Sequence, residues 1–294
     1  MKYIFSFLII LSSFHLPAQN VGVGTTTPVE RLDVNGNINV AGTIKANGVD
    51  GQPNQVLMKD QSGAFVWGDL CNYKNQAYFD AVTTQNWAVP ANVQRISIEA
   101  WGSGGGGSSY SGGGGGGYIV ATFAVTPGEI ISITINFGGN GGNGNTAGTA
   151  GGNTIITVDD TTVTAHGGNG GTAGSQIPTT TGGYYSVTNG FSNFFAVRGE
   201  AGHGCEYMFT NNGTNALEIV FNGNGGNAGN TNSTGALGAY RIVFTGSPSS
   251  TVRYRLPEVG RQPGGGGGAG FSMISGTSTN NGFAGGSGAV VIHY

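Results

Sequence analysis

The sequence carries few charges. Asp, Glu, Lys and Arg make up 9% of the 294 residues, and the formal net charge is −3. No lysine follows Lys74, and beyond it only Arg253 and Arg255 stand close together. Nucleic-acid-binding surfaces need clustered Lys and Arg to neutralise phosphates. The composition therefore argues against a nucleic-acid partner.

Long apolar runs are also scarce. One mostly apolar stretch, residues 4–14, follows Lys2 and precedes Leu16-Pro17-Ala18. This is the pattern of a secretory signal peptide with a small residue at the cleavage point, and the run is shorter than the ~20 residues that a membrane-spanning helix needs. We expect residues 1–18 to be a signal peptide and the mature chain to be secreted or displayed on the cell surface, without inserting into a membrane. The alternative is an N-terminal core strand.

Cysteine is limited to Cys71 and Cys205. An even count in an exported protein permits one disulfide between them; two unpaired, buried thiols are the alternative. His203 and Cys205 lie two residues apart, but no second His stands at metal-ligand spacing. The chain also lacks a Gly-x-Ser-x-Gly elbow, a His-Glu-x-x-His motif and a lysine-ended phosphate loop. We expect no enzyme activity, no metal site and no cofactor.

Glycine is abundant, at 59 of 294 residues, against a usual share of ~7%. The chain is nevertheless 37% hydrophobic and 10% aromatic, unlike disordered chains, so a packed core is expected. Ordering glycine costs roughly 0.5–1 kcal/mol more than ordering alanine, which favours tracts that use the missing Cβ for close backbone packing. The tracts are residues 102–117, 138–152, 167–174, 223–229, 264–270 and 282–288.

Spacing within these tracts indicates how they fold. Glycines recur every third residue at Gly223, Gly226 and Gly229, and again from Gly138 to Gly144. Three residues make one turn of a polyproline-II helix. We therefore predict polyproline-II-like (polyglycine-II-like) tracts packed side by side; flexible loops are the alternative.

Between the tracts, short runs alternate apolar and polar residues with the period of a half-buried strand. In residues 95–101 this places Ile96, Ile98 and Ala100 on one face. No segment has a helical period, so the predicted class is all-β. Further predicted strands are residues 119–125, 131–137, 154–158, 161–165, 194–198, 217–221, 240–244 and 289–293, with a turn at Asp159-Asp160.

A boundary is expected near residues 72–77. In residues 19–74, short runs (32–34, 38–40 and 43–45) are separated by Asn-Gly and Ala-Gly pairs, and Asn-Gly is a strong turn signal. Residues 23–28, 32–36, 55–57 and 62–67 resemble the stalk segments of phage tail-fibre-like proteins and bacterial surface proteins. The resemblance implies a short fibre-like β stalk and a homotrimer.

Residues 75–294 resemble the glycine-rich domain of phage tail-fibre adhesins and bacterial surface proteins. The resemblance is carried by residues 87–93, 96–102, 117–118, 123–129 and 288–294. It implies a distal, ligand-contacting tip whose glycine framework presents variable loops. Residues 175–215 depart from the glycine-rich pattern and form an aromatic and polar insert.

The insert supplies most of the candidate binding residues. Aromatic side chains offer flat, rigid contact area, so the candidate ligand-binding residues are Tyr110, Tyr184, Tyr185 and Tyr207. Phe194, Phe195 and Phe209 are predicted to be core. The function expected is that of an adhesin-like protein binding a cell-surface glycan or protein.

Two other functions remain open. The chain could be a structural component of an extracellular matrix or appendage, in which the glycine tracts serve packing alone. It could also bind ice, because Thr146 and Thr149, like Ala147 and Ala150, repeat at three-residue spacing.

Overall fold

The structure, a computed structural model, describes residues 20–52, 55–60, 62–69, 73–143, 146–173, 180–212, 215–230, 235–246, 250–270 and 281–294. The signal peptide predicted at residues 1–18 and Cys71 lie outside these residues. The chain divides into two units, Met1–Leu70 and Cys71–Tyr294. The described part of the chain contains strands and no helix, so the all-β prediction is confirmed.

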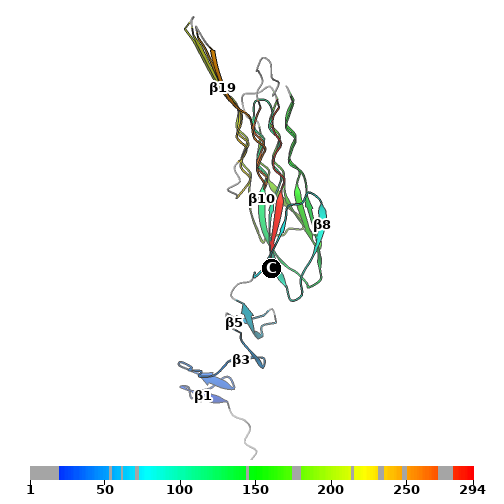
Figure 1. Ribbon diagram of the computed structural model, residues 1–294. Coiled ribbons are helices and arrows are strands. Elements are labelled where there is room, and N and C mark those ends of the chain that lie inside the picture. The colour runs from blue at the N-terminus through cyan, green and yellow to red at the C-terminus, as the bar shows by residue number, and fades with distance from the viewer. Residues whose placement is uncertain are drawn as a thin grey trace, which may run out of the picture. The chain divides into compact units, whose positions relative to one another are not determined.

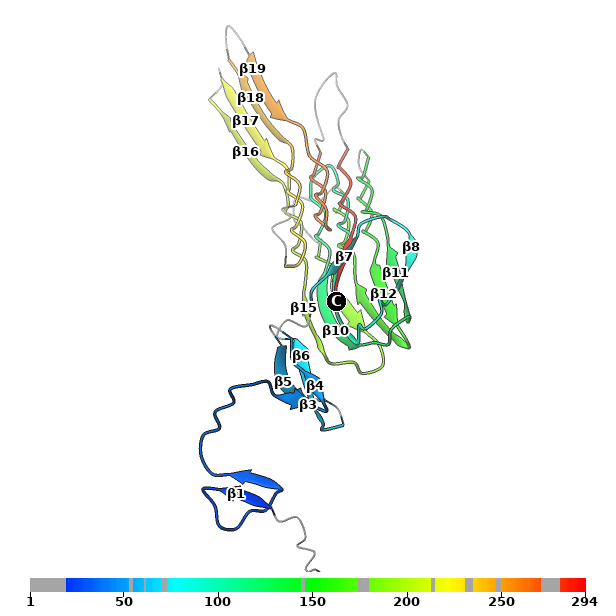
Figure 2. The same ribbon diagram turned by 60° about the horizontal axis from the view of Figure 1, so that its bottom comes forward.

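The described part of the first unit contains three two-stranded pairs (Figure 2). β1 (Val21–Val23) runs parallel to β2 (Leu32–Val34), whereas β3 (Lys45–Ala46) with β4 (Val49–Asp50) and β5 (Gln55–Lys59) with β6 (Phe65–Asp69) are antiparallel. Asn47 and Gly48 have φ of 51° and 80° and form the tight turn between β3 and β4, as expected of Asn-Gly. The short run at residues 38–40 forms no strand.

The second unit begins with a β-sandwich. One sheet has the order β15-β10-β9-β20-β7 and the other β14-β13-β12-β11-β8, all antiparallel. The first comprises β7 (Gln76–Phe79), β9 (Arg95–Trp101), β10 (Tyr118–Ala124), β15 (Phe194–Val197) and β20 (Ala289–His293). The second comprises β8 (Thr84–Ala88), β11 (Ile130–Ile135), β12 (Thr154–Val158), β13 (Thr161–Ala165) and β14 (Tyr185–Val187).

The sandwich core is built from the residues that alternate inward. Ile96, Ile98 and Ala100 are 0%, 1% and 0% exposed, and they pack with isoleucines of β11 and β12 from the opposite sheet. The strands predicted at residues 95–101, 154–158, 161–165 and 289–293 have the predicted limits, and Asp159 makes the predicted turn with φ of 49°.

From the sandwich the glycine tracts continue as a bundle of extended chains, seen as wavy ribbons in Figure 1. At its centre lie residues 102–108 and 111–117, joined at Tyr110; apart from Tyr110, every residue from 102 to 117 is buried. The bundle is completed by residues 138–143, 146–152, 166–172, 180–184, 199–204, 222–229, 235–239, 258–270 and 281–288.

Backbone hydrogen bonds of the central tract point in a new direction at each residue and repeat every third residue. The amides of Gly102, Gly105 and Ser108 donate to residues 117, 114 and 111. Those of 103 and 106 donate to 152 and 149, and those of 104 and 107 donate to 286 and 283. The carbonyls of the same tract accept from residues 139, 142, 168, 171, 267 and 270. The tract therefore bonds to six neighbours, which confirms the predicted packing.

The glycines of the bundle are explained by the close approach of neighbouring backbones and not by unusual φ angles. Of its described glycines, Gly264 alone has a positive φ. A Cβ added at Gly105 would overlap the carbonyl of Asn169, and one at Gly113 would overlap the carbonyl of Gly105. Neighbouring tracts fill the space that a side chain would occupy, so the missing Cβ is what permits this density.

A four-stranded antiparallel sheet extends from the bundle (Figures 1 and 2). Its order is β16 (Glu206–Asn211), β17 (Ala216–Phe221), β18 (Tyr240–Thr245) and β19 (Ser250–Arg255). The bundle tracts 199–204 and 222–229 lead into β16 and out of β17. We call this element the projecting sheet.

Candidate functional site

The projecting sheet is the most unusual surface of the second unit. None of its residues whose side chains the structure describes is buried. The figures show it as a single layer standing apart from the sandwich. Sheets of globular proteins normally bury at least one face, so two accessible faces in one layer make it the candidate interaction surface.

The strand register assigns each side chain to one of two faces. The Met208 face carries seven apolar or aromatic side chains on β16, β17 and β18, and three charges on the outer strands β16 and β19. Its members are Glu206, Met208, Thr210, Leu217, Ile219, Phe221, Tyr240, Ile242, Phe244, Thr251, Arg253 and Arg255. The ring contact between Phe221 and Tyr240, and the Arg255 guanidinium 5.3 Å from the Tyr240 ring centre, lie on this face.

The opposite face, the Tyr207 face, mixes rings with polar groups. It is formed by Tyr207, Phe209, Asn211, Ala216, Glu218, Val220, Arg241, Val243, Thr245, Val252 and Tyr254. Arg241 and Glu218 form an ion pair of 3.6 Å at its centre. Exposed phenol and phenyl rings beside an amide and a charge pair can stack on a ligand and hydrogen-bond to it.

The four candidate tyrosines do not form one site. Tyr207 is exposed on the projecting sheet. Tyr110, half-buried, lies near the root of that sheet, because its carbonyl accepts from Gly223, two residues after β17 ends. Tyr184 and Tyr185 lie at the sandwich end of the bundle, about 20 Å away along seven residues of extended tract at ~3.1 Å each.

Local contacts hold Tyr184 and Tyr185. The ring of Tyr184 stacks on the His166 imidazole with centroids 3.9 Å apart, and His166 Nε2 shares a 2.9 Å hydrogen bond with the Ser186 hydroxyl. Burial lowers the pKa of His166. Tyr185 meets Phe194 edge-on at 5.6 Å. Both tyrosines keep part of their rings exposed, but they form a small patch compared with the projecting sheet.

The core prediction for the phenylalanines is right for one of three. Phe194 packs against the sandwich core. Phe195 is 60% exposed, because it points outward on edge strand β15, and Phe209 is 52% exposed because no described segment covers the projecting sheet. Sequence reasoning also missed Met208 and Tyr254. Residues 251–255 alternate polar and apolar side chains and could have been recognised as a strand, whereas Tyr207, Met208 and Phe209 are consecutive and give no strand period.

The threonines behind the ice-binding hypothesis are occupied by internal bonds. The Thr149 hydroxyl accepts a 2.7 Å hydrogen bond from the Asn140 amide, and the Thr146 hydroxyl accepts one of 2.7 Å from Asn143. Asn224 and Asn227 act similarly, accepting from the amides of Gly238 and Gly235 through their side-chain oxygens. At the bundle surface, side chains thus bond the outward amides that lack a neighbouring tract.

A partly buried polar network lies on the outer side of the first sheet. The carboxylate of Glu99 accepts a 2.8 Å hydrogen bond from the Tyr118 hydroxyl and contacts His293 Nε2 at 2.8 Å. Burial, reinforced by the bond to Glu99, raises the pKa of Tyr118 to about 12. The adjacent Trp101 donates from its indole to the carbonyl of Gly229. The network ties the sandwich to the bundle.

Cys205 has no disulfide within the described residues, and Cys71 lies outside them, so the pairing stays a prediction. Burial, with Glu206 nearby, raises the pKa of the Cys205 thiol. Within the same residues no group of three His, Cys, Asp or Glu side chains could hold a metal ion. No helix of the described chain has the length and apolar character to cross a membrane.

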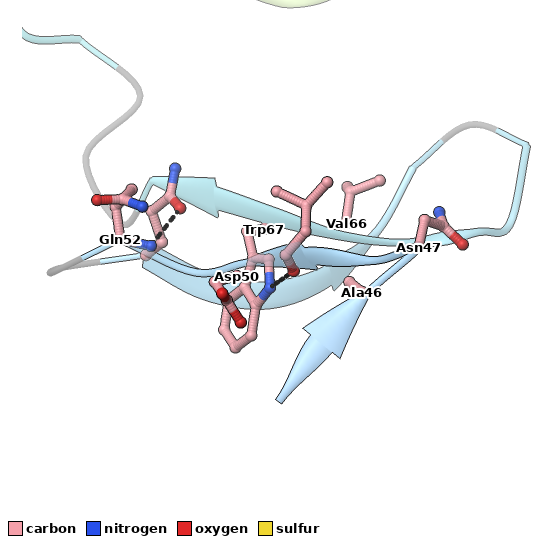
Figure 3. Close-up of a pocket in the computed structure, with 8 residues that line it drawn as sticks. Ala46, Asn47, Asp50, Gln52, Val66 and Trp67 are labelled. Atoms are coloured by element: carbon pink, nitrogen blue, oxygen red, sulfur yellow. Dashed lines mark hydrogen bonds between the residues drawn. The ribbon is translucent and has the colours of Figure 1, made fainter. Parts of the chain in front are cut away.

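The first unit has a hollow of about 360 Å³ beside Trp67 (Figure 3). The Trp67 indole donates to the carbonyl of Val49 at 3.0 Å, and Lys45 holds Asp50 at 3.6 Å. Asn47, Gln52 and Gln55 add amides to the lining. Residues of the β3–β4 and β5–β6 hairpins line this hollow with an indole and several polar groups, and it was not predicted from the sequence.

Comparison with known families identifies the second unit. A family model described as a glycine-rich domain matches residues 80–294, well over half of the chain. The matched residues include the bundle, the projecting sheet and nearly the whole sandwich. A comparison with curated proteins found no match.

Proposed function

Because the chain belongs to the glycine-rich domain family, with an ordered bundle in place of flexible glycine loops, we propose that it is a secreted, adhesin-like binding protein. The bundle holds the projecting sheet through hydrogen-bonded tracts, and the sheet offers accessible aromatic residues. One observation carries the proposal: a single-layer sheet with no buried side chain among those described, rooted in a rigid scaffold.

The ligand that best suits the Tyr207 face is a cell-surface glycan. Tyr207 and Tyr254 flank the face on its two outer strands, with Asn211 and the Glu218–Arg241 pair between hydrophobic side chains. Sugar rings offer apolar faces that stack on aromatic rings and hydroxyls that bond amides and charged groups. Immobilising Tyr costs little side-chain entropy, which favours it in recognition surfaces.

The test is binding of the purified chain to arrayed glycans and to whole cells. Saturable binding is expected, weakened about tenfold for each ring removed in Tyr207→Ala and Tyr254→Ala, equivalent to ~1.4 kcal/mol. Tyr78→Ala is the matched control, because Tyr78 is 56% exposed on the sandwich and Tyr207 is 54% exposed.

Each alternative gives a different result. Binding that needs Tyr184 and Tyr185, and not Tyr207, moves the site to the sandwich end of the bundle. Saturable binding to a purified surface protein, with no glycan bound, replaces the glycan by a protein ligand. The absence of saturable binding to any cell or array contradicts the adhesin proposal and favours a structural role in a matrix or appendage.

A further inference from the structure

The Met208 face differs from the Tyr207 face in chemistry. Its two inner strands carry aliphatic and aromatic residues without interruption: Leu217, Ile219 and Phe221 on β17, and Tyr240, Ile242 and Phe244 on β18. Charges occur only on the outer strands, with Glu206 on β16 and Arg253 and Arg255 on β19. An apolar centre with a charged rim is the usual anatomy of a protein–protein interface.

We propose that the Met208 face docks against the same face of a second copy of this chain, related by a two-fold axis parallel to the strands. Such a pair is a small β-sandwich of two copies, with sheets about 10 Å apart. A two-fold contact requires a surface that complements itself, and the register shows that this face does.

The apolar residues match under this symmetry. The rotation places β16 over β19 and β17 over β18 of the second copy. A cross-strand row is the set of four residues paired side by side across the sheet, and each row keeps its position along the strands. Phe221 then lies opposite Tyr240 of the second copy, and Leu217 opposite Phe244. In the middle row Ile219 lies opposite Ile242, which follows from the pairing of these residues within one sheet.

The charges match as well. Glu206 and Arg255 belong to one row, at opposite edges of the sheet, because each flanks the paired residues Phe221 and Tyr240. The rotation therefore brings Glu206 of each copy over Arg255 of the other. The alternative two-fold axis, running across the strands through the middle row, superposes Arg253 on Arg253. Like-charge repulsion disfavours that arrangement and selects the axis along the strands.

The docking leaves the Tyr207 faces of both copies on the outside. One face covers four strands about 4.8 Å apart and about 3.4 Å per residue along them, which is roughly 400 Å² in projection. This is a small interface that dissociates on dilution, so its formation is read from a concentration series. A dimer presents two ligand surfaces, and the contact itself does not depend on the proposed glycan.

Neighbouring residues of β16 supply a matched test. Met208 is 57% exposed on one face, and Phe209 is 52% exposed on the other. Neither substitution to Lys disturbs a buried site, so circular dichroism is expected to match the wild type. Met208 lies opposite Arg253 of the second copy, because both occupy the middle row. Met208→Lys therefore introduces repulsion, whereas Met208→Glu introduces attraction.

Light scattering over a concentration series reads the outcome for the full chain. The wild type, Phe209→Lys and Met208→Glu are expected to double in mass as concentration rises, and Met208→Lys to stay at half that mass. If the first unit trimerises, the wild-type mass at high concentration corresponds to six copies and the mass of Met208→Lys to three. A wild-type mass equal to that of Met208→Lys overturns the proposal. Equal dissociation of the Lys and Glu variants also overturns it, because the charge pairing then fails.

Discussion

Substituting Gly105 by Ala measures how tightly the glycine bundle is packed. Gly105 lies in the central tract, and a Cβ there would overlap the carbonyl of Asn169. That carbonyl cannot move freely, since it accepts a 2.8 Å hydrogen bond from the Gly114 amide. The added methyl therefore has to push two tracts apart.

The size of the effect follows from three contributions. Overpacking costs about 1–3 kcal/mol. The displaced contact weakens one or two backbone hydrogen bonds, each contributing about 0.5–1.5 kcal/mol. Against this, Ala stabilises by about 0.4–1 kcal/mol through the lower entropy of the unfolded chain. We expect Gly105→Ala to lower the free energy of unfolding by about 2–4 kcal/mol.

The measurement is urea unfolding followed by circular dichroism and tryptophan fluorescence, with Trp101 reporting on the junction of bundle and sandwich. Gly246→Ala is the control, because the atoms nearest to a Cβ there belong to the side chains of Asn215 and Phe244, each at 2.8 Å. Those side chains can rotate away, so this variant is expected to stay within about 0.5 kcal/mol of the wild type. Equal stability of the two variants would refute close packing of the tracts.

Three further predictions concern single hydrogen bonds and titrations. Thr149→Val removes the acceptor of the Asn140 amide and is expected to cost about 0.5–1 kcal/mol in urea unfolding, whereas Thr149→Ser keeps most of that stability. Tyr118 stays protonated in the folded chain up to a pKa of about 12, so unfolding midpoints should fall as pH rises from 10 towards 12, and Tyr118→Phe should flatten this fall. His166 has a lowered pKa in the folded chain, so stability should decrease as pH falls below 6.5. His166→Gln should reduce that decrease, and an unchanged slope would show that another group causes it.

The sandwich was predictable because its strands bury one face. Alternation in residues 95–101 gave both the limits of β9 and its inward residues, since burial of Ile96 and Ile98 fixes the register. The bundle was predictable from a second period. The interval of three from Gly223 to Gly229 corresponds to amides that donate to residues 110, 113 and 116 of one neighbouring tract.

Only the two inner strands of the projecting sheet were predicted, as residues 217–221 and 240–244. In its outer strands, Tyr207, Met208 and Phe209 are consecutive on β16, and the apolar Val252 and Tyr254 of β19 lie on the face opposite Met208, so no single pattern separates inside from outside. Phe209 was predicted to be core because aromatic residues of this kind usually are. Similarly, nothing in the local sequence places Tyr110 near β17 and Tyr184 at the other end of the bundle. Those positions depend on how distant tracts pair.

The hydrogen-bond directions of the bundle also restrict how its tracts can change in length. Each amide rotates by a third of a turn from the one before it, so adding three residues repeats the existing set of neighbours. Adding one or two would aim every later amide at the wrong tract. Insertions in multiples of three, made together in the four tracts that join the strands of the projecting sheet (residues 199–204, 222–229, 235–239 and 258–270), would carry that sheet outward in steps of about 9 Å at ~3.1 Å per residue. Reach can thus evolve in discrete increments while the scaffold keeps its internal bonding.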